Sequence, residues 1–263
     1  MIKQIHNLLP GDYPWQNQIH WYDVIDSTNT RAKQLAAGGA PHGTVLIADR
    51  QTGGRGRRGR SFLSPSGMGI YMSVILRPHC TPDQMMHLTC ATAVAMCDAV
   101  EASTGLRPGI KWTNDLVHQK RKLAGILTEL VTTPQGICAV VGIGINCCQR
   151  EGDFAPEIQN FAGSLSMVTG RAIDRPAVAA AMLCSLLEMD KTLLTGKQAM
   201  MARYEKDCVT LGKDICLLRS DTVQYGYAEG IDPEGALLVR FSDGRLEAVN
   251  SGEVSVRGMY GYI

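Results

Sequence analysis

The chain has 263 residues, which suits one large domain, or a main domain of about 200 residues with a small partner domain. Its composition, 45% hydrophobic and 19% charged, excludes a disordered, fibrous or disulfide-only protein. The 26 basic and 25 acidic side chains give a formal net charge of +1. No global field therefore favours nucleic acid or anionic membrane, and any anion site is expected to be local.

Signals for membrane insertion or secretion are missing from the sequence. The longest uncharged apolar stretches, 137–148 and 177–187, are shorter than the roughly 20 residues that span a bilayer. The first residues contain no apolar run of signal-peptide length and no small-residue cleavage site. The nine cysteines form no CxxC pair, and the adjacent Cys147 and Cys148 are too close for ordinary disulfide geometry. We expect a cytoplasmic protein with reduced thiols.

Strands and helices are predicted together up to about residue 211. A strand at 19–25 leads into a helix that reaches about residue 37, with N-cap residues at 26–29 and Gly38-Gly39 at its end. The other predicted strands lie at 44–48, 69–76, 110–112, 123–131 and 137–145, and the other predicted helices at 82–103, 175–194 and 197–209. The strands at 123–131 and 137–145 are expected to form a hairpin.

Beyond residue 211 the sequence predicts short strands only. They lie at 215–218, 223–229, 236–241, 246–249 and 254–256, with turn signals at 232–235 and 243–244. This spacing is typical of a small barrel. We therefore predict an α+β protein with two domains, residues 1–211 and 212–263.

The segment 53–60, GGRGRRGR, contains four arginines and four glycines. Gly54, Gly56 and Gly59 spell GxGxxG, but residues 61–67 cannot open the helix that a dinucleotide site requires. An RNA-binding arm would carry interleaved aromatics and further basic clusters, and a solvated basic turn would gain nothing from such dense arginines. We favour a mobile clamp for a carboxylate or phosphate, because glycines allow close backbone approach and guanidinium groups bind these anions bidentately.

A second group of polar residues interrupts apolar strands between residues 111 and 129. Asn114-Asp115 alone would be an ordinary turn, and Lys122 alone an edge-strand charge. Together they indicate a site with an amide, a carboxylate and a cation in fixed places. The glycine-spaced strand at 142–146 would let a ligand or another backbone approach. The histidines show no metal-ligand spacing. From the basic loop and the polar residues at 111–129, the sequence alone indicates an enzyme that acts on a nucleotide or a carboxylate.

Five motifs occur in order along the chain. They are Ser27-Thr28-Asn29, Gln51 followed by GGRGRRGR, KWTNDL at 111–116, RKLAGIL at 121–127 and GIGIN at 142–146. In this combination the chain resembles the biotin protein ligases from about Ile19 onward. The resemblance implies a catalytic domain related to class II aminoacyl-tRNA synthetases, with a mixed sheet flanked by helices, and a C-terminal SH3-like β-barrel.

The resemblance also implies an activity. Biotin and ATP, with Mg²⁺, would give biotinyl-5′-AMP and pyrophosphate, and biotin would then pass to one lysine of a biotin carboxyl carrier protein domain. That carrier would belong to acetyl-CoA carboxylase or a related biotin-dependent enzyme. A lipoate or octanoate protein ligase or transferase, which shares the catalytic fold, and an RNA-binding module remain as alternatives.

Site residues carry over from the same motifs. Lys122 and Arg57 would be the catalytic cations, which neutralise the phosphate and the carboxylate as they meet. The implied biotin-binding residues are Ser27, Thr28, Asn29, Gln51, Arg55, Gly56, Arg57 and Lys122. The implied ATP or adenylate residues are Arg57, Arg60, Phe62, Lys111, Asn114 and Asn146, with Phe62 stacking on adenine. Asp115 would be the Mg²⁺ contact.

Two departures from the family pattern bear on these expectations. Thr113 stands where many bacterial members have proline, a change that removes no chemical group. Some bacterial members begin with a winged-helix DNA-binding domain, whereas about eighteen residues precede the first predicted strand here. We therefore expect no operator binding. A homodimer remains open.

Overall fold

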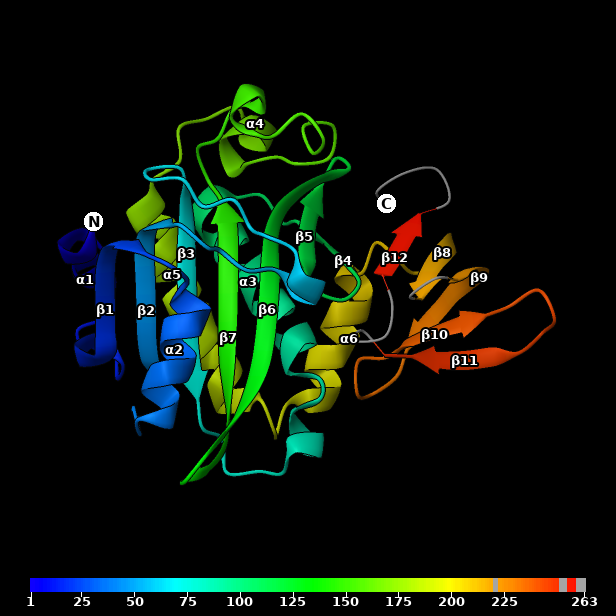
Figure 1. The fold of residues 1–263 in the computed structure, drawn as a ribbon, viewed down its shortest axis with the longest axis horizontal. Helices are drawn as coiled ribbons and strands as arrows, with labels where there is room; N and C mark the ends of the chain where they lie inside the picture. The colour runs from blue at the N-terminus through cyan, green and yellow to red at the C-terminus, as the bar shows by residue number, and fades with distance from the viewer. Residues whose placement is uncertain (220–221, 251–254, 259–263) are drawn as a thin grey trace.

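The computed structural model describes residues 1–219, 222–250 and 255–258, and its main body is built on a seven-stranded mixed sheet (Figure 1). The strands are β1 (Ile19–Ile25), β2 (Thr44–Gln51), β3 (Gly69–Leu76), β4 (Gly109–Lys111), β5 (Asp115–His118), β6 (Arg121–Thr133) and β7 (Gly136–Asn146). Their order in the sheet is β1-β2-β3-β7-β6-β5-β4. β1 and β2 run parallel, and every other neighbouring pair is antiparallel.

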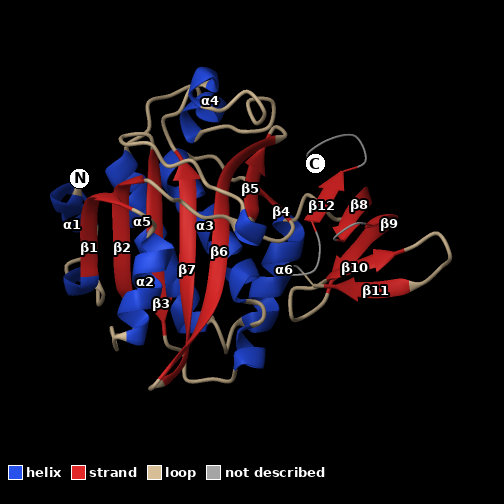
Figure 2. Ribbon diagram, viewed as in Figure 1, coloured by secondary structure: helices blue, strands red, loops and turns tan. Residues whose placement is uncertain are grey.

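Helices cover both faces of this sheet (Figure 2). On one face, α2 (Thr28–Ala37) packs over β2, β3, β6 and β7. The other face carries α3 (Leu88–Thr104), α5 (Arg175–Thr192), α1 (Ile2–Leu8) and α6 (Lys197–Asp207). The short α4 (Leu165–Thr169) lies beyond one end of the sheet (Figure 1). No helix among the described residues is both long and apolar enough to cross a membrane.

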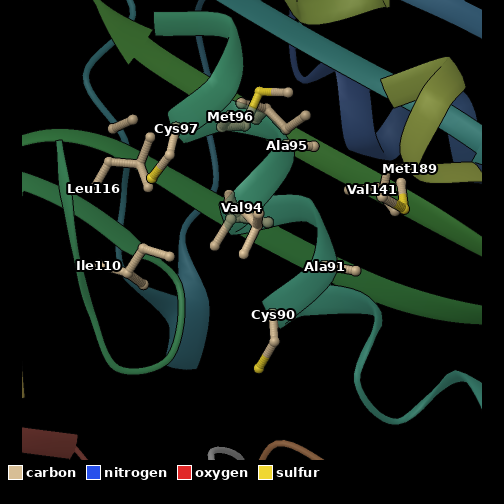
Figure 3. Close-up of a cluster of buried hydrophobic side chains, with 14 of the residues drawn as sticks. Cys90, Ala91, Val94, Ala95, Met96, Cys97, Ile110, Leu116, Val141 and Met189 are labelled. Carbon is tan, nitrogen blue, oxygen red and sulfur yellow. The ribbon is translucent and has the colours of Figure 1, made fainter. Parts of the chain in front are cut away.

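The larger hydrophobic core lies between the sheet and α3. Val94 and Met96 of this helix are fully buried and belong to the same cluster of buried side chains as Val141 of β7 and Met189 of α5 (Figure 3). α3 is apolar around most of its circumference, which is the pattern of a helix covered on all sides. A smaller core forms under α2, where Ala32 and Ala36 allow a close approach to the sheet.

Capping residues account for the helix boundaries. The Ser27 hydroxyl accepts a hydrogen bond from the Thr30 amide at the start of α2, and Asp174 accepts one from Ala177 at the start of α5. α5 also has a proline in its first turn, where no intrahelical donor is needed. α3 ends at Gly105, whose φ of 75° is in the left-handed region.

A second, five-stranded antiparallel sheet follows α6. It comprises β8 (Asp214–Arg219), β9 (Thr222–Ile231), β10 (Leu237–Arg240), β11 (Leu246–Val249) and β12 (Ser255–Gly258), in the order β11-β10-β9-β8-β12. Leu217, Leu237 and Val239 are fully buried on it. The Trp112 indole donates a 3.0 Å hydrogen bond to the Gly235 carbonyl, so the two sheets are joined beside β4.

Most predicted elements are confirmed, including the α+β class, the mixed sheet flanked by helices, and the β6–β7 hairpin. The predicted helix at 82–103 is wrong at its start, because Pro82–Met85 forms a separate 3-10 turn with a capping box and α3 begins at Leu88. β5, α1 and α4 were not predicted. These elements are short, and short apolar patterns carry little periodic signal. Residue 254 of the last predicted strand lies outside the described residues.

Candidate active site

A cavity with about 1050 Å³ of empty space, its open mouth included, lies between the start of α2, the Arg/Gly loop 53–60 and strands β5 to β7. Ligand sites in proteins are typically concave cavities of this kind. The residues nominated from the sequence that line it are Ser27, Thr28, Asn29, Gln51, Arg55, Gly56, Arg57, Arg60, Phe62, Lys111, Asn114, Asp115 and Lys122. The structure thus brings together all nominated residues except Asn146.

Hydrogen bonds fix the polar side chains at the start of α2. The Thr28 amide and hydroxyl both donate to Gln51 Oε1, at 2.8 and 3.1 Å. Gln51 Nε2 in turn donates to the Ser64 hydroxyl at 2.9 Å. Because both ends of the Gln51 amide are engaged, its orientation beside the helix N-terminus is defined.

The side chain of Asn29 is fixed by three hydrogen bonds. Its Nδ2 donates to the Leu127 carbonyl at 3.2 Å and to Glu129 Oε2 at 3.1 Å, and its Oδ1 accepts a 2.6 Å hydrogen bond from Ser73. A Cβ at Gly142 would overlap the Asn29 amide, so only glycine leaves room for it. Asn29 therefore forms a rigid part of the cavity wall.

Phe62 occupies the space left by a second glycine of the same strand. A Cβ at Gly144 would lie 2.5 Å from Phe62 Cε1, which is closer than real Cβ contacts. The ring also packs edge-to-face against Tyr71, with 6.4 Å between centroids. We expected the glycine-spaced strand to admit a ligand or another backbone; in the structure, the groups that approach it closely are the side chains of Asn29 and Phe62.

The Arg/Gly loop folds back on itself instead of opening a helix. The Gly56 amide donates to the Arg60 carbonyl at 2.7 Å, and Arg57–Gly59 forms a 3-10 turn in which Arg58 has a φ of 56°. The Arg57 guanidinium donates a 2.7 Å hydrogen bond to Asn114 Oδ1. Burial lowers the pKa of Arg57, while the nearby Asp115 carboxylate opposes that shift. Asn114 thus links the loop to the turn before β5.

Lys122 and Asp115 form an ion pair inside the cavity, with Nζ and Oδ1 2.6 Å apart. The backbone of Lys122 is fixed as well, since its amide donates to the Phe161 carbonyl at 2.6 Å and its carbonyl accepts from the Gly163 amide at 2.9 Å. Within the described part of the chain, no group of three or more His, Cys, Asp or Glu side chains could hold a metal ion.

Asn146 lies outside the cavity lining. Its Nδ2 donates to the Gly163 carbonyl at 2.9 Å, and its Oδ1 accepts from Gln149 Nε2 at 3.1 Å. Both bonds tie the end of β7 to the segment that covers the start of β6. A direct adenylate contact by Asn146 stays a prediction.

Several site residues were not nominated from the sequence. Ser73 is fully buried and bonded to both Thr28 and Asn29, and its signal is the single serine in the otherwise hydrophobic segment GIYMSVIL. Val256 lines the cavity from β12, and no local pattern could reveal a contact between two separate sheets. The other such lining residues are Arg58, Ser61, Trp112, Gly125, Ile126, Leu127, Gly142, Ile143 and Gly144.

The charge of the cavity is strongly one-sided. Among the described residues that line it, six are cationic, namely Arg55, Arg57, Arg58, Arg60, Lys111 and Lys122, and one, Asp115, is acidic. In a chain with a formal net charge of +1, this concentration is a local anion site. None of the nine cysteines lines the cavity, and burial raises the pKa of Cys90 and Cys147 to about 12, which keeps both thiols protonated.

Two family models match this chain. Residues 21–146 match the biotin/lipoate A/B protein ligase family, and residues 210–257 match the biotin protein ligase C terminal domain. The chain is 36% identical over 238 residues to the bifunctional ligase/repressor BirA of Bacillus spizizenii, which covers 90% of this chain and 73% of the relative. This chain belongs to the biotin protein ligase family.

Two further comparisons support the membership of this chain in the biotin protein ligase family. The chain is 33% identical over 242 residues to the biotin–acetyl-CoA-carboxylase ligase of Paracoccus denitrificans, and the match covers 89% of this chain and 98% of the relative. The solved structure of the biotin protein ligase from Aquifex aeolicus in complex with biotin and ATP matches with a TM-score of 0.80 and 32% identity, over 92% of this chain and 99% of that one. The resemblance inferred from five motifs is confirmed.

The matched segments coincide with the cavity of this biotin protein ligase. Residues 21–146 contain every lining residue but Val256, which lies in the second matched segment. The family relationship therefore applies to the residues that build the site as well as to the fold.

Proposed function

We propose that this chain activates biotin with ATP to biotinyl-5′-AMP and pyrophosphate, and transfers biotin to a lysine of a biotin carboxyl carrier protein domain. The observation that carries the proposal is the cavity with six cations, one carboxylate and a hydrogen-bonded polar wall at the start of α2. Two mutually repelling anions, a carboxylate and a triphosphate, have to meet in such a site.

In the first step, the biotin carboxylate attacks the α-phosphorus of ATP, the new carboxyl oxygen–phosphorus bond forms, and the bond to the β-phosphate breaks. Lys122 and Arg57 neutralise the charge that gathers at the α-phosphate. Lys122 is already positioned for this by Asp115 and by its backbone hydrogen bonds to Phe161 and Gly163. Such preorganisation lowers the cost of reaching the transition state.

In the second step, the neutral amine of the carrier lysine attacks the acyl carbonyl and an amide forms. The bond from the acyl carbon to the phosphate oxygen breaks, AMP leaves, and the amine loses one proton to the solvent. Lys122 polarises the acyl carbonyl as negative charge develops on its oxygen. The hydrogen bond from Arg57 to Asn114 keeps the Arg/Gly loop over the intermediate until the carrier arrives. Water exclusion by this loop would protect the mixed anhydride from hydrolysis.

The two ends of the cavity suit the two substrates. Ser27, Thr28, Asn29 and Gln51 would surround the biotin ring system, whose buried polar atoms need hydrogen-bonding partners, and Arg55 and Gly56 would cover it. Arg60, Phe62, Lys111 and Asn114 would surround the adenylate. We propose that Asn146 supports this end indirectly, through the segment it binds at Gly163 and Gln149.

Magnesium fits the site only together with ATP. Asp115 is the one acidic side chain among the described lining residues, and a single carboxylate does not make a metal cage. Asp115 would therefore hold Mg²⁺ only together with ATP phosphates and water. When bound, the ion neutralises phosphate charge.

We further propose that residues 1–211 form a catalytic domain related to class II aminoacyl-tRNA synthetases, and residues 212–263 an SH3-like barrel. The change from a mixed, helix-covered sheet to five antiparallel strands supports this division, as does a second family match that begins at residue 210. Val256 supports a role for the C-terminal unit in closing the cavity.

Biotin-dependent exchange of labelled pyrophosphate into ATP tests the proposal without any knowledge of the carrier. We expect exchange with biotin and Mg²⁺ and none with lipoate, and background exchange in a Lys122→Ala variant. Exchange with lipoate alone would reassign the chain to lipoate activation. No exchange with either acid, from protein shown to be folded, would overturn the proposal.

A further inference from the structure

Glu129 of β6 does not line the cavity, yet its carboxylate joins three elements that do. Oε2 accepts the hydrogen bond from Asn29 Nδ2 at 3.1 Å, and Oε1 lies 2.7 Å from Lys33 Nζ on the next turn of α2. The same Oε1 lies 3.9 Å from the Arg55 guanidinium of the Arg/Gly loop. One half-buried carboxylate therefore connects β6, α2 and the loop.

The hydrogen bonding of Asn29 depends on an acceptor at this position. A carboxylate and a backbone carbonyl can only accept, so Glu129 and the Leu127 carbonyl together fix which end of the Asn29 amide is nitrogen. The Asn29 oxygen is thereby turned toward Ser73, which also bonds Thr28. The orientation of this part of the cavity wall is set from Glu129.

The charge of Glu129 also acts on the loop. Lys33 and Arg55 are both cations, and without the carboxylate between them they would repel each other. Burial raises the pKa of Glu129, but the hydrogen bonds from Lys33 and Asn29 and the charges of Lys33 and Arg55 lower it overall. The side chain is therefore ionised at neutral pH and can attract the arginine.

We propose that Glu129 is a positioning residue of this site, which orients the Asn29 amide and tethers Arg55 so that the Arg/Gly loop lies over the biotin end of the cavity. This rests on the proposed function, because it concerns the biotin end. Lys122 and Asp115 are held by their own 2.6 Å ion pair, so we expect the reacting end of the cavity to be left intact when the Glu129 carboxylate is removed.

The test compares Glu129→Gln, which keeps the shape and loses the charge, with the matched control Glu188→Gln, which removes an exposed partner of Lys191 on α5. In biotin-dependent pyrophosphate exchange we expect the KM for biotin to rise about tenfold in Glu129→Gln, the size of one lost charge-assisted contact, with kcat within about twofold. The control should match the unaltered protein. An unchanged KM for biotin would overturn the proposal.

A second readout needs no activity. Limited trypsin digestion, followed by mass spectrometry, measures cleavage after Arg58 and Arg60 in protein without substrate. We expect severalfold faster cleavage in Glu129→Gln, because the loop has lost its tether, and no change in Glu188→Gln. This separates the two ideas: absent exchange by the unaltered protein would defeat the proposed function, whereas unchanged loop cleavage would defeat the tether.

The exposed Arg55 side chain provides a variant that should fold even if Glu129→Gln does not. Arg55→Gln removes the loop end of the tether and leaves the bonds of Glu129 to Asn29 and Lys33 in place. We expect the same faster cleavage after Arg58 and Arg60. Cleavage at the rate of the unaltered protein would overturn the tether on its own.

Discussion

The ammonium group of Lys122 and the carboxylate of Asp115 lie 2.6 Å apart, although the two residues come from adjacent strands that are out of regular register. β5 and β6 pair Leu116 with Ala124 and then Val117 with Lys122, which leaves one extra residue in β6. Such a β-bulge re-aims the side chains beside it and is common next to active sites. In regular register Lys122 would pair with His118 and lie on the face opposite to Asp115; with the extra residue it pairs with Val117 and lines the cavity.

Replacing Lys122 should abolish most of the adenylation activity. Lys122→Ala is expected to reduce biotin-dependent pyrophosphate exchange by about 10²–10³-fold, because a preorganised charge at the reacting phosphate is lost. Circular dichroism should show an unchanged fold. Turnover close to that of the unaltered protein would remove Lys122 from the mechanism.

Asp115 has two proposed partners, Lys122 and Mg²⁺, and one variant can separate them. Asp115→Asn keeps the shape but no longer pairs with Lys122, so kcat should fall by about tenfold or more. If Asp115 also holds the ion, half-maximal exchange will require several times more Mg²⁺. A lower kcat with an unchanged Mg²⁺ titration would show that Asp115 acts through Lys122 alone.

Loosening the loop should release the intermediate. Arg57→Gly removes the 2.7 Å hydrogen bond to Asn114, which joins the loop to the turn before β5. We expect biotinyl-AMP to leave the enzyme faster and to biotinylate lysines of a bystander protein such as serum albumin. The lifetime of the bound intermediate, measured by gel filtration of the complex, should shorten. An unchanged lifetime would contradict the clamp.

Gly142 offers a test of how tightly the cavity wall is packed. A Cβ there would overlap the Asn29 amide and break its bonds to Ser73 and Glu129, so Gly142→Ala should destabilise the protein by about 1–3 kcal/mol and weaken biotin binding. Gly152→Ala is the matched control, since a Cβ there meets nothing within 4 Å. Chemical denaturation and calorimetric biotin titration measure both effects. Equal behaviour of the two variants would refute the packing argument.

Short motifs predicted most of the cavity lining, because many of the lining residues sit in segments with distinctive composition. Ser27 to Asn29, the Arg/Gly loop and Lys111 to Asp115 all interrupt apolar elements with polar groups. What the motifs could not predict are the contacts that arise only on folding. Ser73 and Glu129 look like ordinary strand residues until α2 is packed on the sheet, and Val256 reaches the cavity from a separate sheet.

The same contrast between local signals and long-range contacts applies to the prediction of the fold. Strands β1 and β3 and the capped starts of α2 and α5 were predictable because alternation, apolar runs and capping residues are local signals. β5 was not, because its four residues begin with the polar Asp115, and its pairing with β4 and β6 decides its conformation. Sheet order likewise depends on long-range pairing.

Asp49, which does not line the cavity, should make the free energy of unfolding depend on pH. Its carboxylate accepts hydrogen bonds from the Ser66 hydroxyl, the Gly67 amide at 3.2 Å and the Arg175 guanidinium at 2.8 Å. These contacts join the end of β2, the turn before β3 and the start of α5. Burial raises the pKa of Asp49, but the hydrogen bonds from Ser66, Arg175 and Gly67 lower it overall, below its usual 3.8.

A carboxyl group whose pKa is lower in the folded state stabilises the protein above its unfolded pKa and loses this effect as the pH falls through the folded value. Asp49→Asn should therefore reduce the free energy of unfolding at pH 7 by about 1–2 kcal/mol, and the difference from the unaltered protein should shrink steadily below about pH 4. Urea denaturation across this range measures it, with Asp12→Asn at an exposed position as the control. A difference that stayed constant with pH would mean that Asp49 contributes through packing and not through its charge.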